Sequence, residues 1–344
     1  MDQQQFNDKQ NMLPPPVQLF EIATGFMKSQ AIYVAAKLGI ADFLKDGAKK
    51  VEELARITGV HTNSLHRLLR ALASIGIFAE RDDRYFELTP LASALRKDVP
   101  MSLRPYVMLL GDKSWWDSWG DLLYSVKTGE AAFDHLFGMD YIEYLEQHPE
   151  LAQIFNETMT SVSQAHNPAI VASYDFSQFQ KIVDVGGGHG SLITTILKAN
   201  HSLKGVLFDL PHVVNSIDQL DAEIGKRCEV ISGDFFKEVP DGGDLYILKQ
   251  IIHDWDEEAS IKILKNCHKV MPEHGRILVI DAIIEPGNAP NITKFFDLHM
   301  LVTAPGGMER TKSEFRSLFK EAGFEVSKII STPSTFFIIE GARK

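Results

Sequence analysis

The stretch KIVDVGGGHG at residues 181–190 joins a short apolar run to a glycine-rich turn, and a helical pattern follows it. Glycines between a strand and a helix let the backbone come close to a ligand. Beyond this stretch, apolar runs alternate with helical patterns: GVLFDL, CEVISGD, LYILK, RILVIDAII, and a closing pair, FEVSKII and TFFIIEG. Strands separated by helices predict a parallel sheet with helices on both faces, so we expect an α/β domain over residues 176–344.

Two acidic residues stand where a nucleotide would lie in such a sheet. Asp209 ends the second predicted strand, where a carboxylate can bind both hydroxyls of a ribose. Asp234 follows the third strand beside Phe235, a pair that can hold adenine by a hydrogen bond and by stacking. The glycine spacing, Asp-x-Gly-x-Gly-x-Gly from Asp184, differs from the G-x-G-x-x-G of dinucleotide sites. On the glycine loop alone, a tight turn without a ligand is the alternative.

A histidine follows the fourth predicted strand. Residues just beyond the carboxyl ends of parallel strands line the crevice of the sheet, so His253 is expected there. A neutral imidazole can take a proton near neutral pH, which would help a phenol whose pKa is about 10 to react. Asp281 and Glu309 could hold the imidazole in its useful tautomer. The alternatives are that His253 is a helix cap or core residue, and that Glu309 pairs with Arg310 or Lys312.

The chain before residue 176 has a different character. We expect a mobile N-terminus over 1–13, a winged-helix-like domain over 14–105, and a helical linker that forms a wall of the acceptor pocket over 106–175. In the second domain, HTNSLHRLLRALASIGI predicts a helix with Thr62 or Asn63 as N-cap, and FAERDDRYFEL predicts a hairpin that turns at Asp82 and Asp83.

Composition narrows the class of protein. The 344 residues carry a net charge of −11, which disfavours general nucleic-acid binding. Two cysteines make no disulfide framework, and we see no cluster with the spacing of metal ligands. The polar start resembles no signal peptide, and no apolar run of about 18 residues predicts a membrane span. We therefore expect a soluble, cytoplasmic protein of two domains.

The motifs together resemble a known family. The glycine loop, LKQIIHDWDEE, FDLHML and PGGMERT are similar to small-molecule O-methyltransferases that use S-adenosylmethionine. The family includes the plant caffeic-acid and flavonoid enzymes, bacterial enzymes that tailor polyketides and phenazines, and animal acetylserotonin O-methyltransferase. The resemblance runs from about Pro16 and is most specific over 182–315. It implies a Rossmann-like class I methyltransferase sheet after an N-terminal helical, winged-helix dimerisation domain.

The resemblance also implies roles for individual residues. His253 would be the general base, flanked by Asp281 and Glu309. S-adenosylmethionine, converted to S-adenosylhomocysteine without a metal, would be bound by Asp184, Gly186, Gly187, Gly188, Asp209, Leu210, Gly233, Asp234, Phe235 and Lys249. The acceptor would be lined by Trp116, Phe133, Phe155, Met159, Asp254, Trp255, Met300 and Ala304. Many plant enzymes carry asparagine where Ala304 stands, so a phenylpropanoid acceptor is not favoured.

The resulting hypothesis is a homodimeric O-methyltransferase. Its acceptor would be a phenolic or enolic hydroxyl of a small aromatic or polyketide-like secondary metabolite. One alternative is a cofactor-dependent hydroxylase or decarboxylase on the same fold. Another is a winged-helix regulator that binds DNA through His66, Arg67 and Arg70, although residues 1–110 carry only 14 basic against 12 acidic side chains.

Overall fold

The structure is a computed structural model that describes residues 13–215 and 220–344. It forms two compact units. Unit 1 contains the chain up to Lys113 together with Gln153–Ser161, and unit 2 contains Ser114–Ala152 and Val162–Lys344. The segment expected to be a helical linker, 106–175, is thus divided between the two units. Most of the expected mobile N-terminus lies outside the described residues.

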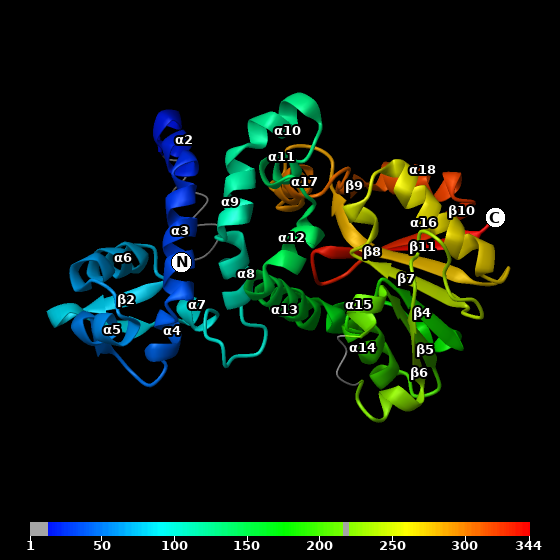
Figure 1. The fold of residues 1–344 in the computed structure, drawn as a ribbon, viewed down its shortest axis with the longest axis horizontal. Coiled ribbons are helices and arrows are strands. Elements are labelled where there is room, and N and C mark those ends of the chain that lie inside the picture. The colour runs from blue at the N-terminus through cyan, green and yellow to red at the C-terminus, as the bar shows by residue number, and fades with distance from the viewer. Residues whose placement is uncertain (1–12, 216–219) are drawn as a thin grey trace. The chain divides into compact units, whose positions relative to one another are not determined.

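Unit 1 consists of helices and a small antiparallel sheet in the order β1-β3-β2 (Figure 1). The strands are β1 (Lys49–Lys50), β2 (Phe78–Arg81) and β3 (Tyr85–Leu88). The helices are α2 (Pro15–Ala23), α3 (Gly25–Lys37), α4 (Ile40–Phe43), α5 (Val51–Thr58), α6 (Thr62–Ser74), α7 (Pro90–Ser93) and α8 (Arg104–Leu110).

The local predictions for unit 1 have two outcomes. The hairpin at Asp82 and Asp83 is confirmed, because β2 and β3 pair across a turn in which Asp83 has a φ of 58°. The predicted N-cap of α6 is wrong: His61, one residue earlier, caps the helix, and its ring accepts a hydrogen bond from the backbone N–H of Ser64. The spacing of the buried leucines on α6 is as expected for one helical face.

Unit 2 is built on a mixed sheet in the order β10-β11-β8-β7-β4-β5-β6 (Figure 1). Its strands are β4 (Lys181–Val185), β5 (Lys204–Asp209), β6 (Cys228–Ser232), β7 (Leu245–Lys249), β8 (Arg276–Ile284), β10 (Phe324–Ser331) and β11 (Phe336–Arg343), and β9 (Arg310–Thr311) pairs with β8. Strands β4 to β8 are parallel, and β11 is antiparallel to both β8 and β10. The closing pair therefore makes the sheet mixed instead of wholly parallel.

The helices of unit 2 precede or alternate with the strands. They are α9 (Lys113–Gly120), α10 (Leu122–Thr128), α11 (Ala132–Phe137), α12 (Tyr141–Gln147), α14 (Ser191–Ala199), α15 (Pro211–Val214), α16 (Glu257–Val270), α17 (Thr293–Thr303) and α18 (Lys312–Glu321). Helix α13 (Pro149–Ser173) contributes residues to both units. Within the described residues, no helix is both long and apolar enough to cross a bilayer.

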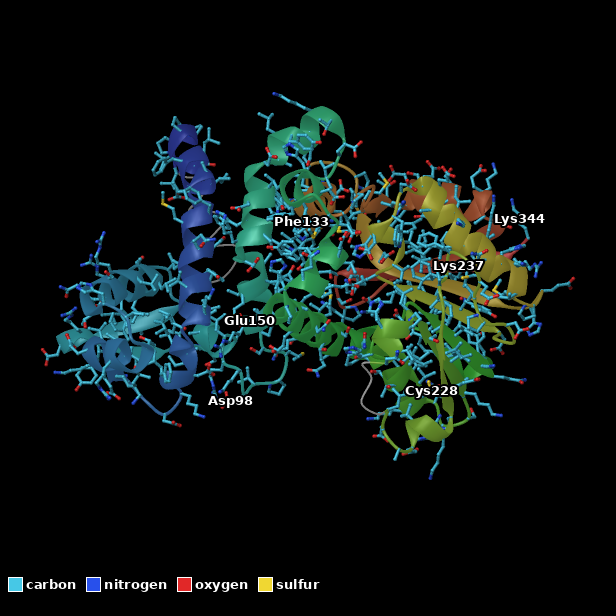
Figure 2. The ribbon with its side chains drawn as sticks, viewed as in Figure 1. Asp98, Phe133, Glu150, Cys228, Lys237 and Lys344 are labelled. Atoms are coloured by element: carbon cyan, nitrogen blue, oxygen red, sulfur yellow. The ribbon has the colours of Figure 1, made fainter. Side chains whose placement is uncertain are left out.

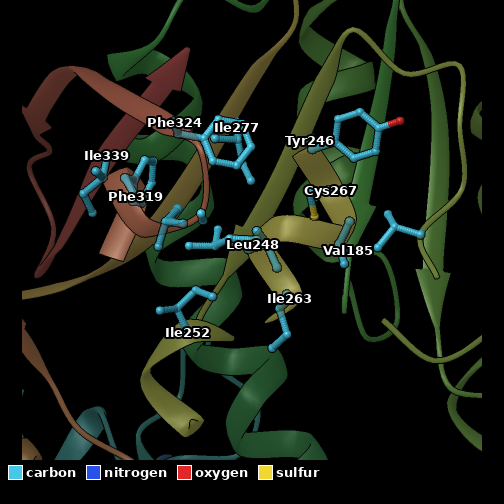
Figure 3. Close-up of a cluster of buried hydrophobic side chains, with 14 of the residues drawn as sticks. Val185, Tyr246, Leu248, Ile252, Ile263, Cys267, Ile277, Phe319, Phe324 and Ile339 are labelled. Carbon is cyan, nitrogen blue, oxygen red and sulfur yellow. The ribbon is translucent and has the colours of Figure 1, made fainter. Parts of the chain in front are cut away.

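Two apolar cores cover the faces of this sheet. Side chains of α16 and α18, including Ile263, Cys267 and Phe319, pack on one face (Figure 3). Helix α14 and the end of α13 pack on the other, where Ile193 and Ile170 are fully buried. Covering both faces explains why these strands are continuous apolar runs in the sequence.

The strand order fixes where a ligand can bind. From β4 the chain adds β5 and β6 on one side, and then returns to place β7 on the other side of β4. In open α/β sheets, ligands bind in the crevice at the carboxyl ends of strands where this order reverses. The glycine loop after β4 and the loop after β7, which carries His253, both leave the sheet at that point.

Candidate active site

The glycine loop has a shape that other residues cannot adopt. Gly186, Gly188 and Gly190 have φ values of 69°, 59° and 75°, in the left-handed region that favours glycine. A Cβ added to Gly186 would lie 2.5 Å from Ile251 Cδ1, and one added to Gly187 would lie 2.4 Å from a Leu207 methyl group. The loop is therefore closely packed against its neighbours, and its backbone is exposed to a ligand without intervening side chains.

The acidic residues predicted for the cofactor lie around this loop. Asp209 Oδ2 accepts a hydrogen bond from the Gly188 N–H, and Oδ1 accepts one from Leu210, both at 2.7 Å. Asp184 is 1% exposed, and its Oδ2 has no hydrogen-bond partner within the described residues. Burial raises the pKa of Asp184 to about 7, with Lys249 acting against this shift. An unpartnered buried carboxylate beside a glycine cradle fits the ammonium group of an amino-acid ligand.

Aromatic rings gather where adenine is expected. The Phe235 ring lies near the loop, 3.5 Å from where a Cβ on Gly186 would stand. Asp234 Oδ1 accepts a hydrogen bond of 2.8 Å from the Phe236 N–H. Trp255, predicted to line the acceptor pocket, packs edge-on against Phe235 and Phe236, with ring centroids 6.2 and 4.7 Å away. The structure thus groups Trp255 with the residues predicted to bind adenine.

His253 lies in a short 3-10 turn, Ile252–Asp254, and is held by the segment around Glu309. Its Nδ1 is 3.1 Å from Glu309 Oε1, and its backbone carbonyl accepts a 2.8 Å hydrogen bond from the Met308 N–H. A carboxylate on Nδ1 selects the tautomer with the proton on Nδ1, which leaves the Nε2 lone pair as a base. The prediction that Glu309 orients the imidazole is consistent with this geometry, whereas Lys312 pairs with Glu285 at 2.8 Å.

The surroundings of His253 are acidic: Asp281 and Glu309 are buried, whereas the Asp254 side chain is 46% exposed and its Oδ1 lies 3.4 Å from His253 Nε2. Asp254, Asp281 and Glu309, which with His253 we call the His253 cluster, bring three carboxyl groups near one imidazole. Burial lowers the pKa of His253, but attraction to Asp254, Glu309 and Asp281 outweighs it and raises the pKa to about 10. Burial raises the pKa of Asp281 to about 7, and neither of its carboxyl oxygens has a partner within the described residues. This arrangement strongly stabilises an imidazolium.

Arg310 holds the turn that carries His253, a role the sequence analysis did not assign. Its guanidinium donates to the backbone carbonyls of Ile252 and Trp255, both at 2.7 Å, and to Ser260 Oγ at 3.2 Å. The side chain is buried, so these bonds are shielded from water. The sequence analysis left open an ion pair between Arg310 and Glu309. In the structure, the Arg310 guanidinium instead donates to the two backbone carbonyls and to Ser260.

Lys249, at the end of β7, lies between the two acidic regions. Its Nζ donates to Gln250 Oε1 at 3.0 Å and to Ser163 Oγ at 3.3 Å. Burial lowers its pKa, and the charges of Asp184 and Asp281 act against this. The same cation therefore interacts with the carboxylate beside the glycine loop and with one in the His253 cluster.

The residues predicted to line the acceptor pocket fall into separate groups. Met300 and Ala304 converge with His253 around Gly307, because a Cβ added to Gly307 would lie 3.2 Å from Met300 Cε, 2.8 Å from Ala304 Cβ and 3.2 Å from the His253 carbonyl oxygen. Phe133, labelled in Figure 2, belongs to α11. It is fully buried and packs edge-on against Tyr141, so it contributes to a helical core.

For three further residues predicted to line the acceptor pocket, the contacts in the structure do not decide the role. Trp116 is partly buried on α9. Phe155 and Met159 belong to the part of α13 that is counted with unit 1, so their place beside the acceptor stays a prediction. Within the described residues, no group of three or more His, Cys, Asp or Glu side chains is placed to hold a metal ion.

Comparisons with known proteins identify the family of this chain. Residues 119–325 match the model of the O-methyltransferase domain, and residues 20–98 match that of the O-methyltransferase dimerisation domain. The chain is 42% identical to phenazine O-methyltransferase PhzM from Lysobacter antibioticus, over 97% of this chain and 98% of the relative. It is 33% identical to phenazine-1-carboxylate N-methyltransferase from Pseudomonas aeruginosa, over 94% of this chain and 96% of the relative.

A solved structure connects the fold with the cofactor. Human N-acetylserotonin methyltransferase in complex with S-adenosylmethionine superposes with a TM-score of 0.87 at 25% identity, covering 96% of this chain and 99% of that one. Both domain models and full-length relatives are thus matched. The chain therefore belongs to the O-methyltransferase family that uses S-adenosylmethionine.

Proposed function

We propose that this protein transfers the methyl group of S-adenosylmethionine to a phenolic or enolic hydroxyl of a small aromatic or polyketide-like secondary metabolite, with His253 as general base. The observation that carries the proposal is the 3.1 Å contact between His253 Nδ1 and Glu309 at the crevice that the glycine loop also lines. It leaves Nε2 as the atom that can accept a proton once the ring is neutral, a form that the pKa of about 10 makes the minor one at neutral pH. The phenazine relative supports an aromatic acceptor, because its name gives that class of molecule.

The cofactor would be held by groups already in place. Asp184 and the backbone of Gly186 to Gly188 would bind the amino-acid part, Asp209 the ribose, and Asp234 with Phe235 the adenine. When bound, S-adenosylmethionine supplies a methyl group already activated on a sulfonium. The protein's main task is then to align the hydroxyl oxygen with that carbon.

The His253 cluster would manage the proton. His253 Nε2 takes the hydroxyl proton as the oxygen forms its bond to the methyl carbon. The resulting imidazolium is stabilised by Glu309 on Nδ1 and by the nearby Asp281. Arg310 keeps the turn in place by binding the carbonyls on both sides of His253.

Substitution of His253 by alanine tests the base. We expect turnover to fall at least about tenfold, since general-base effects run roughly 10²–10⁴-fold, while the Kd for S-adenosylhomocysteine stays unchanged. His274→Ala is the matched control, because His274 is exposed and its recorded hydrogen bond uses only its backbone carbonyl. Nearly full turnover in His253→Ala would show that orientation alone carries catalysis.

The two alternatives make different predictions. A hydroxylase or decarboxylase would give a product without the mass of one added methylene unit, which mass spectrometry detects. A DNA-binding regulator would need free basic groups on α6, yet His66 Nε2 is 2.8 Å from Glu80. A specific mobility shift of DNA at low salt would support the regulator, and no shift is expected.

We also propose that the protein is a homodimer. Large apolar side chains are exposed along α2 and α3: Leu19, Phe20, Ile22, Phe26 and Met27 are 54–73% exposed, and all but Leu19 lie in the region that matches the dimerisation model. Exposed apolar surface of this kind marks an interaction site. Light scattering should give the mass of two chains, and Phe20→Ser with Ile22→Ser should give one. A cytoplasmic location stays a prediction from the two free cysteines.

A further inference from the structure

His299, on α17, is held by two tryptophans of α9. Its ring centroid lies 4.2 Å from that of Trp115, and 6.3 Å from that of Trp119 with the planes 10° apart. The Trp119 indole N–H donates a 3.1 Å hydrogen bond to His299 Nδ1. Because indole nitrogen can only donate, Nδ1 must be the acceptor, and the ring proton must be on Nε2.

The environment keeps this imidazole neutral. Burial, and to a smaller extent the positive charge of His253, lower the pKa of His299 to about 4. At neutral pH the ring therefore offers one N–H donor and carries no charge. This also shows that His299 is close enough to His253 for their charges to interact.

The donor is available to a ligand. Within residues 13–215 and 220–344, the hydrogen bonds recorded for the His299 ring involve Nδ1 alone, and the side chain is partly buried. Nε2 is not one of the buried side-chain atoms that lack a partner within the described residues, so it is open to water or to a ligand. The next residue, Met300, reaches the Gly307 turn against the His253 backbone. The unpartnered donor thus sits one residue from the predicted acceptor site.

We propose that His299 determines specificity by donating a hydrogen bond from Nε2–H to a neutral acceptor atom of the methylated molecule, a carbonyl oxygen or an aromatic ring nitrogen, with Trp119 setting its tautomer. The inference rests on the proposed methyl transfer. It implies that the enzyme favours hydroxylated ring systems bearing such an atom over pure hydrocarbons of the same shape, since a site built around a donor rejects ligands that leave it unpaired.

Three tricyclic probes of matched shape test this: 1-hydroxyphenazine, 1-hydroxyanthraquinone and 1-hydroxyanthracene. They carry ring nitrogens, carbonyl oxygens and neither, respectively. We expect wild-type kcat/KM to be roughly tenfold or more higher for one or both of the first two, since they pair the donor that 1-hydroxyanthracene leaves without a partner. The compound that the enzyme prefers shows whether the atom that accepts the His299 hydrogen bond is a ring nitrogen or a carbonyl oxygen. Equal values for all three would overturn the proposal.

Variants separate recognition from packing. His299→Phe keeps a ring beside the indoles and should lose the preference: kcat/KM should fall for the two compounds with an acceptor atom and rise for 1-hydroxyanthracene, which then leaves no donor unpaired. His299→Gln retains an N–H and should recover part of it. Trp119→Phe should weaken the preference, because without the indole donor the His299 proton can also lie on Nδ1 and leave Nε2 unable to donate. If His299→Phe changes kcat/KM by the same factor for all three compounds, or changes it for none of them, His299 has only a structural role.

A spectroscopic readout is independent of turnover. In the complex with S-adenosylhomocysteine, ¹⁵N NMR should show His299 as the neutral Nε2–H tautomer at pH 7, and the preferred probe should shift that resonance. A proton on Nδ1, or no shift with any probe, overturns the inference. Loss of the proposed function would look different, because the wild type would then bind no S-adenosylhomocysteine and methylate no probe.

Discussion

Glu309→Gln isolates the charge beside the general base. Glutamine keeps the size of the side chain, which is 5% exposed and 3.1 Å from His253 Nδ1, but removes its negative charge. A hydrogen bond to a charged group contributes roughly 1.5–3 kcal/mol, and 1.36 kcal/mol corresponds to one pKa unit. The pKa of His253 should therefore fall by about 1–2 units. At the high-pH plateau, where the base is unprotonated in both enzymes, the same loss of imidazolium stabilisation should slow methyl transfer by up to about 10–100-fold.

The pH profile measures both effects. Because the base must be unprotonated and its pKa is raised to about 10, wild-type kcat/KM should still rise with pH above 7. In Glu309→Gln the inflection should move to lower pH, and the plateau should drop. Glu285→Gln is the control, since Glu285 pairs with Lys312 on a half-exposed side chain. A variant with an unmoved inflection and full plateau would refute the role given to Glu309.

Three other substitutions test the parts around the base. In Gly186→Ala the new Cβ would lie 2.5 Å from Ile251 Cδ1, so the Kd for S-adenosylhomocysteine, measured by calorimetry, should rise at least about tenfold. Gly225 has open space around its Cβ position, so Gly225→Ala should leave that Kd unchanged. Arg310→Met should lower the free energy of unfolding, measured in urea, by roughly 2–5 kcal/mol, because it leaves buried backbone carbonyls without a donor. Arg316 is exposed, so the control Arg316→Met should change that free energy by less than about 0.5 kcal/mol. Because the pKa of Asp281 is raised to about 7 in the folded protein, the protonated carboxyl stabilises the fold, fully below about pH 4 and no longer once the pH rises through about 7. Asp281→Asn carries no charge at any pH, so its Tm at pH 8 should be higher than that of the wild type. An unchanged Tm would contradict the pKa shift.

Local patterns predicted most of what lies at the strand ends. The glycine spacing from Asp184, the carboxylate of Asp209 and the histidine after β7 could be placed because parallel strands bring their carboxyl ends to one edge. The role of Arg310 could not be read in this way, since its partners are backbone carbonyls about 55 residues away whose position depends on the folded turn. Trp255 and His299 also needed the structure, because sequence spacing does not say which ring an aromatic side chain will meet.

The division of α13 had no signal in the sequence either. The one helix-breaking residue inside it, Pro168, lies within the part counted with unit 2, while the division falls at Gln153 and Ser161. The cap of α6 differs by one residue because the His61 ring nitrogen accepts the bond that a hydroxyl or amide oxygen was expected to accept. These differences arise from tertiary contacts and not from local propensity.

The distribution of the two binding functions over different elements has a consequence for how such enzymes diversify. The groups expected to hold the cofactor sit on loops where even a methyl group would collide with the sheet's own side chains. The candidate acceptor contacts lie on α17, a helix beside the sheet, which carries His299 and Met300 and ends just before Ala304. Changes on that helix leave the strand ends untouched, so a descendant can acquire a new acceptor in a few substitutions while inheriting its methyl donor unchanged.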